Sequence, residues 1–288
     1  MAAIAGMAPR ADGQALRKRV LSAAILLPLA AVDVWLGAPY WGALVCVFAM
    51  VMAWEWARMC AAGRQPPRGS LLHVPPEGLL SILAVALGIS AAAAELYASS
   101  LLFLVLGALG SALLGLQGRG PRGAWQGFGT LYIGLPGVAI VWIRSQPDHG
   151  LAMVVWILAL VVAVDTGAFA AGRLVGGPKL APGISPNKTW AGLLGGIAAA
   201  AVIGGIVALW LGLSPAWRLV LASGVLAVVE QLGDLVESGF KRHFGVKDSS
   251  GLIPGHGGFL DRTDGLLAVS LAVALAELLG GGILAWTR

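Results

Sequence analysis

Charged residues are scarce in this chain. Only 11% of its 288 residues are Asp, Glu, Lys or Arg, whereas 58% are hydrophobic. Soluble domains carry about 25% charged residues, so the composition excludes an ordinary soluble protein and predicts an integral membrane protein. Because the apolar segments leave no room for a large soluble domain, we expect a single integrated membrane domain.

Cysteine is also scarce. The two cysteines, Cys46 and Cys60, match neither the spacing of a metal site nor a disulfide framework. Glycine, by contrast, is abundant, with 42 residues. Small residues let membrane helices approach closely, and such a bundle would be compatible with a homodimer.

The sequence contains many long apolar runs. A spanning helix needs about 20 mostly apolar residues, and nine runs approach that length, at 20–37, 41–58, 78–95, 99–117, 127–143, 151–172, 191–212, 217–233 and 265–286. The predicted fold is therefore an all-α polytopic bundle of about nine transmembrane helices. We divide it into a tail (1–19), N-terminal helices (20–150) and C-terminal helices that carry the polar residues (151–288). A basic segment precedes the first run, but no convincing cleavage site follows it, so we expect a retained helix.

The basic residues indicate the orientation. With the N-terminus in the cytoplasm, the inner segments hold 16 Lys and Arg residues and the outer segments hold 3. Cytoplasmic loops of membrane proteins carry such an excess. We therefore attribute the net charge of +5 to topology and expect no nucleic-acid partner.

Polar residues gather in two inner segments, Gly172–Trp190 and Asp234–Asp264. The eighth span is predicted to continue as one helix from 217 to about 244. Its polar residues then recur at i, i+4, i+7 and i+11, which places them on one face; they are Glu230, Asp234, Glu237 and Lys241. The alternative is a solvated helix end.

A carboxylate within an apolar span points to a functional site. Asp165 lies inside the sixth span, and such residues usually face a cavity or a partner. Asp165, Asp234 and Asp261 are predicted to converge at the cytoplasmic end of the bundle, where carboxylates repel unless a cation joins them. Oxygen ligands in small number suit Mg²⁺, which completes its shell with water and phosphates.

Basic and glycine residues surround these carboxylates. The cations that are candidates for binding phosphate are Lys179, Lys188, Lys241, Arg242, Lys247 and Arg262. Glycines in the segment GHGG let backbone approach a ligand, and His256 is either an acid–base group or a hydrogen-bonding loop residue. Asn187 or Thr189 would cap the seventh span. Together these residues favour a phosphoryl or nucleotidyl transfer site that acts on a phosphate-bearing lipid.

The segment SGFKRHFGVKDSSGLIPGHGGFLDRTD, from Ser238 to Asp264, resembles the signature of the phosphatidate cytidylyltransferases, the CDP-diacylglycerol synthases. The matching positions are Ser238, Lys241, Arg242, Lys247, Asp248, Pro254, His256, Gly257, Gly258, Asp261, Arg262 and Asp264. The upstream segment DTGAFAAGRLVGGPKLAPGISPNKTWAG is similar to the family too, so the specific resemblance covers 165–264. One departure is Ala191, where the family pattern has a glutamate; it weakens any role for a carboxylate there.

The resemblance implies a nucleotidyltransferase of phospholipid biosynthesis. Such an enzyme transfers CMP from CTP to phosphatidate with Mg²⁺, and it releases CDP-diacylglycerol and pyrophosphate. Asp234 and Asp261 are then metal ligands, to which we add Asp165. The remaining implied roles are phosphate contacts by Lys241, Arg242, Lys247 and Arg262, nucleotide contacts by Ser185, Lys188 and Thr189, and a loop over the triphosphate formed by His256, Gly257 and Gly258. We expect the site at the cytoplasmic mouth of a bundle in the inner membrane, open sideways to membrane lipids.

Three other functions compete with this interpretation. An ion-coupled transporter also carries intramembrane carboxylates, but the chain shows no internal repeat and its polar groups crowd one side of the membrane. A CDP-alcohol phosphotransferase would need an Ala-Arg and later aspartates that do not follow Asp264–Gly265. A CTP-dependent lipid kinase is chemically closest, and it differs in transferring the γ-phosphate.

Overall fold

The computed structural model describes residues 32–61, 74–116, 122–252 and 257–280. Helices dominate these ranges: α2 (Tyr40–Ala61), α3 (Pro76–Ala93), α4 (Tyr97–Leu116), α5 (Arg122–Ser145), α6 (Gly150–Leu174), α7 (Trp190–Trp210), α8 (Trp217–His243) and α9 (Asp264–Gly280). A short 3-10 helix, η1 (Leu260–Arg262), precedes α9, and two strands, β1 (Lys179–Ala181) and β2 (Ser185–Thr189), precede α7.

Seven of the described helices, α2 to α8, are long and apolar enough to cross a membrane. They coincide with the second to eighth spans expected from the sequence, and the 17 residues of α9 coincide with the beginning of the ninth. The first expected span, 20–37, lies mostly outside the described residues. An all-α, multi-pass membrane bundle is therefore confirmed, whereas the total of about nine spans and the side of the N-terminus stay predictions.

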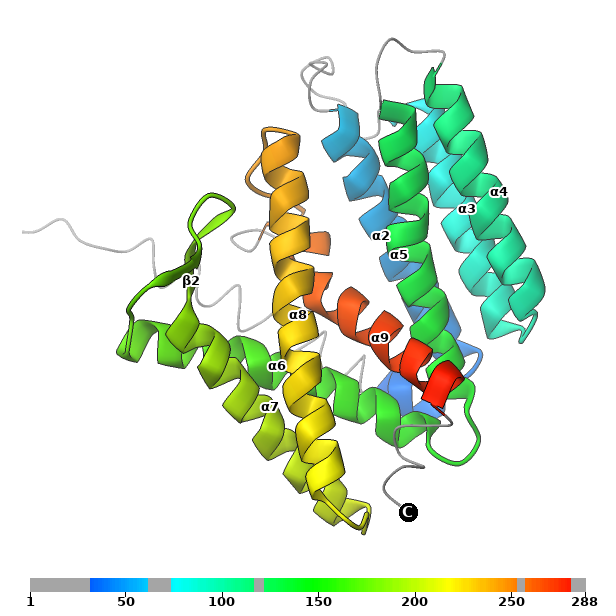
Figure 1. Ribbon diagram of the computed structural model, residues 1–288. Helices are drawn as coiled ribbons and strands as arrows, with labels where there is room; N and C mark the ends of the chain where they lie inside the picture. The colour runs from blue at the N-terminus through cyan, green and yellow to red at the C-terminus, as the bar shows by residue number, and fades with distance from the viewer. Residues whose placement is uncertain (1–31, 62–73, 117–121, 253–256, 281–288) are drawn as a thin grey trace, which may run out of the picture.

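The helices form two groups (Figure 1). Helices α2 to α5 lie side by side in one group, and α6, α7 and α8 form the other. Helix α9 runs between the groups and packs against both α5 and α8. The β1–β2 hairpin, which follows α6, lies next to the end of α8, because Arg242 Nε of that helix donates to the Ile184 carbonyl at 3.3 Å.

An aromatic cluster joins the two groups near the end of α8. Trp56 of α2 is fully buried and donates its indole N–H to the Trp125 carbonyl of α5 at 2.9 Å. The ring of Phe240 on α8 stands edge-on to Trp56, with 5.2 Å between the ring centroids. Glycine permits this packing, since a Cβ on Gly129 of α5 would lie 2.0 Å from Trp56 Nε1. The cluster therefore sets the position of α8 relative to the N-terminal helices.

The polar segment before α7 contains two strands, which the sequence analysis did not predict. Strands β1 and β2 pair antiparallel and form a small hairpin. Thr189, the last residue of β2, caps α7, because its hydroxyl accepts the Gly192 N–H at 3.0 Å. The predicted cap is confirmed at Thr189. The hairpin also gives Lys188 a defined direction that an irregular loop would not supply.

Helix α8 extends to His243, as its charge pattern predicts. Glu230, Glu237 and Lys241 on its polar face are buried, with exposures of 2%, 0% and 9%. A solvated helix end would leave these side chains in water, so that alternative is wrong. The polar face of α8 instead packs inside the protein, where each charge needs a partner.

Candidate active site

A polar cavity opens between α6, the β1–β2 hairpin, α7 and α8. Its volume is about 550 Å³, within the usual range of about 300–1,000 Å³ for small-molecule pockets. The polar and charged side chains in its wall are Asp165, Arg173, Asn187, Lys188, Thr189, Gln231 and Asp234. Asp165, which the sequence predicted to face a cavity or a partner, lines this cavity.

An ion pair crosses this cavity wall. The Nζ atom of Lys188 on β2 lies 2.7 Å from Asp234 Oδ2 on α8. The same ammonium donates to Gln231 Oε1 at 2.9 Å, and Asp234 Oδ1 accepts the Ser238 hydroxyl at 3.2 Å. Both charged side chains are partly accessible, at 15% and 29%. The two predicted residues therefore meet in the cavity and keep a face open to a ligand.

Asp264 is a further carboxyl group that interacts electrostatically with Asp234. It is the first residue of α9 and lies outside the seven apolar spans. Burial, and then the charge of Asp234, raise the pKa of Asp264 to about 7. Because burial is the larger cause, the raised pKa reflects mainly the cost of keeping a charged carboxylate away from water.

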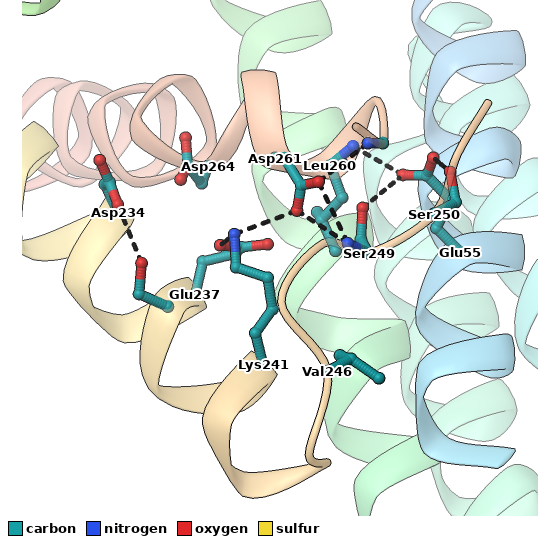
Figure 2. Close-up of polar contacts among 12 residues, drawn as sticks. Glu55, Asp234, Glu237, Lys241, Val246, Ser249, Ser250, Leu260, Asp261 and Asp264 are labelled. Carbon is teal, nitrogen blue, oxygen red and sulfur yellow. Dashed lines mark hydrogen bonds and ion pairs between the residues drawn. The ribbon is translucent and has the colours of Figure 1, made fainter. Parts of the chain in front are cut away.

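Asp261 lies in a second hydrogen-bond network, beside the cavity residues (Figure 2). Its Oδ1 is 3.1 Å from Lys241 Nζ, and its two oxygens accept the Ser249 N–H at 3.0 and 3.1 Å. Its Oδ2 also accepts the Gly258 N–H at 2.8 Å. Lys241 pairs in addition with Glu237, at 2.5 Å. Asp261 thus links α8 to both ends of the loop that carries the sequence signature.

These contacts control the ionisation of Asp261, which lies outside the apolar spans. Burial raises the pKa of this carboxyl group, but hydrogen bonding by Glu237 and the Gly258 N–H, together with the Lys241 charge, lowers it by more. The net pKa lies below the ordinary value of 3.8. Asp261 is therefore a stable anion at neutral pH.

The three aspartates predicted as metal ligands do not form one group. Within the described part of the chain, no three His, Cys, Asp or Glu side chains are arranged to hold a metal ion. Asp165 and Asp234 line the cavity, whereas Asp261 is bonded to Lys241 and the loop. Two carboxylates still fit Mg²⁺, since this ion is usually held by one or two carboxylates plus substrate phosphates. The donor set at Asp165 and Asp234 is compatible with that chemistry.

The other predicted residues are placed around these two networks. Ser185 is half-buried in the hairpin, and Arg242 donates to the Ile184 and Val246 carbonyls at 3.3 and 3.1 Å. Lys247 and Arg262 are exposed. His256 lies outside the described residues. Nothing in these positions tests phosphate or nucleotide binding, so those roles stay predictions.

Glu55 is the residue of this region that the sequence analysis missed. It belongs to α2 and is fully buried. It accepts four hydrogen bonds from residues near the two ends of the loop 249–260, which we call the signature loop. The sequence did carry a signal, because Glu55 is the only acidic residue in the apolar run 41–58. As for Asp165, a single carboxylate in such a run indicates a side chain that faces a cavity or a partner.

Gly258 is confined between these groups. A Cβ at this position would lie 1.9 Å from Ser249 Oγ and 2.8 Å from Glu55 Oε1. We expect Gly258→Ala to lower the melting temperature of the detergent-purified protein by several degrees, since the overlap forces the loop off its partners. Gly251→Ala is the matched control, because open space surrounds a Cβ there. Equal melting temperatures for the two variants would contradict this account of the loop.

Comparisons with known proteins find similarity over most of the chain. A family model described as "Cytidylyltransferase family" matches residues 17–279. A phosphatidate cytidylyltransferase of Brucella suis biovar 1 (strain 1330) is 45% identical over 179 residues, which cover 62% of this chain and 64% of the relative. One from Staphylococcus saprophyticus is 41% identical over 143 residues, covering 49% of this chain and 55% of the relative. The matched region thus spans less than two thirds of either relative.

Proposed function

The chain belongs to the cytidylyltransferase family, and we propose that it transfers CMP from CTP to phosphatidate, giving CDP-diacylglycerol and pyrophosphate. The single observation that carries the proposal is the cavity where Lys188 and Asp234 meet beside Asp165. It provides a cation for phosphate and carboxylates for a metal within one polar space. The relatives named above support CTP and phosphatidate as the substrates.

The proposed reaction needs little acid–base help. An oxygen of the phosphatidate phosphate forms a bond to the α-phosphorus of CTP, while the bond from that phosphorus to the bridging oxygen breaks. Pyrophosphate leaves with the electron pair of that bond. Because the nucleophile is already an anion, the barrier lies in bringing two polyanions together and in stabilising charge on the leaving group.

The residues of this chain supply that electrostatic support. Lys188 would contact a phosphate in the cavity, and Arg173 is a second cation in the cavity wall. Asp234, with Asp165, would hold Mg²⁺, which when bound neutralises phosphate charge. Lys241 and Asp261 hold the signature loop beside α8, and the exposed cations Lys247 and Arg262 flank this loop in the sequence.

We further propose that the site faces the cytosol, at the inner mouth of the bundle in the cytoplasmic membrane. The excess of Lys and Arg in the segments that follow α6 and α8 supports this side. There CTP arrives from water, while the lipid keeps its acyl chains in the bilayer.

Position-specific labelling tests the proposed reaction. The purified protein is incubated with Mg²⁺, phosphatidate and CTP labelled separately at the α- and the γ-phosphorus. We expect the α-label in lipid and the γ-label in pyrophosphate. Movement of the γ-label into lipid would show a kinase instead. If neither label moves with any divalent metal, the proposed function is wrong, and ion-coupled transport becomes the function to test.

A further inference from the structure

Glu55 holds both ends of the signature loop from a helix in the other half of the chain (Figure 2). Its Oε1 accepts the Ser250 hydroxyl at 2.5 Å and the Phe259 N–H at 2.8 Å. Its Oε2 accepts the Ser249 hydroxyl at 3.2 Å and the Leu260 N–H at 2.7 Å. Each carboxylate oxygen therefore joins one residue before the loop's central segment to one residue after it.

Glu55 and Asp261 divide the donors of this loop between them. At Ser249 the backbone N–H points to Asp261 and the hydroxyl points to Glu55. At the other end the Gly258 N–H donates to Asp261 and the next N–H, of Phe259, donates to Glu55. Both carboxylates accept hydrogen bonds from adjacent groups of the same two chain segments. A shift of the loop away from Glu55 would therefore also disturb its hydrogen bonds to Asp261.

The face of α2 around Glu55 is shaped to receive the loop. The Phe48 ring packs on Phe259 with 4.5 Å between centroids, and Thr263 Oγ1 donates to Met52 Sδ at 3.0 Å. Phe48, Met52 and Glu55 are spaced by four and three residues, so they share one face of the helix. This face contacts the chain on both sides of Asp261.

A carboxylate is an expensive choice for a buried position on a membrane helix. It is compensated here because charge-assisted hydrogen bonds are about twice as strong as neutral ones, and four donors converge on Glu55. An amide could not accept all of them. Its NH₂ group would face one backbone N–H, and although a serine hydroxyl can rotate to accept, a backbone N–H cannot.

We propose that Glu55 is a positioning residue for the transfer reaction: it sets the place of the loop segments 249–252 and 257–260 and, through the neighbouring donors that bind Asp261, the place of Asp261. The inference rests on the proposed function for its kinetic part. Its structural part, the anchoring of the loop, is independent of any substrate. Misplacement of catalytic groups by about 1 Å can cost about 10²-fold in rate, so the effect of losing this anchor should be large.

The decisive variant is Glu55→Gln, which keeps the size of the side chain and removes one acceptor oxygen. We expect kcat for CMP transfer to fall by about 10- to 100-fold, with a smaller change in KM for CTP. The control is Thr130→Val, which removes the buried hydrogen bond between Thr130 and Ser81, 2.8 Å long, on α5 and α3. This control loses stability but is expected to keep kcat within twofold of wild type.

A second readout needs no activity. Lys247 is exposed and lies two residues before Ser249, so trypsin cleavage after Lys247 reports release of the loop. We expect faster cleavage in Glu55→Gln than in wild type or Thr130→Val at equal temperature. If wild type itself transfers no CMP, the proposed function fails, while the cleavage rates still test the anchor.

Two results would overturn the inference. One is a Glu55→Gln protein whose kcat stays within twofold of wild type; the other is an unchanged cleavage rate after Lys247. If Glu55→Gln does not fold, the double variant Ser249→Ala/Ser250→Ala replaces it, since it removes only the two hydroxyl donors. A several-fold fall in kcat with faster cleavage supports the anchor, and wild-type values of both overturn it.

Discussion

Asp234→Asn is expected to lower kcat for CMP transfer by about 10²- to 10³-fold or more, because an electrostatic group in a preorganised site contributes on that scale. The substitution keeps the shape of the side chain but removes the charge that pairs with Lys188 at 2.7 Å. It also removes the carboxylate proposed to hold Mg²⁺. The measurement is transfer of the α-label from CTP to phosphatidate by the purified variant.

The matched control is Asp148→Asn, the same chemical change on an exposed residue between α5 and α6. This variant should keep wild-type kcat and melting temperature. Asp234→Asn should also remain folded, since Asp234 is partly accessible to water. Wild-type turnover by Asp234→Asn would remove Asp234 from the catalytic site, and with it the cavity as the place of reaction.

Lys241→Met should produce the largest loss of stability among single changes at the site. Lys241 is 9% exposed and its ammonium lies between two carboxylates, 2.5 Å from Glu237 and 3.1 Å from Asp261. Removing one partner of a buried ion pair costs about 3–5 kcal/mol, because it leaves uncompensated buried charge. Denaturation of the detergent-purified variant, followed by its loss of helical signal, measures this free energy of unfolding.

The pH dependence of the stability lost in Lys241→Met provides a second test. In wild type the pKa of Asp261 is lowered, so its contribution to stability is complete above the ordinary value of 3.8 and is lost as pH falls further. Without Lys241 this pKa rises, so the stability gap between Lys241→Met and wild type should narrow towards acid pH. Lys247→Met, which removes an exposed ammonium, is the stability control. A gap that is absent at neutral pH would contradict the buried ion-pair network.

Local sequence patterns were sufficient to predict the described membrane helices. The apolar runs predicted seven described helices within a few residues, because the length and hydropathy of a membrane span are properties of one continuous segment. The spacing of Glu230, Asp234, Glu237 and Lys241 predicted one polar face of α8 for the same reason, since it follows from helix geometry alone. The family signature likewise lies in one stretch, and the match over 17–279 agrees with it.

The pairing of these charges depended on tertiary structure. We expected Asp165, Asp234 and Asp261 to lie together. In the structure, Lys188 of the hairpin forms an ion pair with Asp234, and Lys241 forms one with Asp261. The sequence shows which basic residues could pair with each carboxylate, but not which of them does. The pairing depends on which groups the packed helices bring within hydrogen-bond distance.

By itself, the sequence determined that this chain is a multi-pass membrane protein of the cytidylyltransferase family and that its polar chemistry lies along α8 and the signature loop. Tertiary structure alone decided that Glu55 supports this loop, across 194 to 205 positions of chain. The physical reason is that burial and periodicity act within a segment, whereas a hydrogen bond between α2 and the loop exists only after the helices between them have packed.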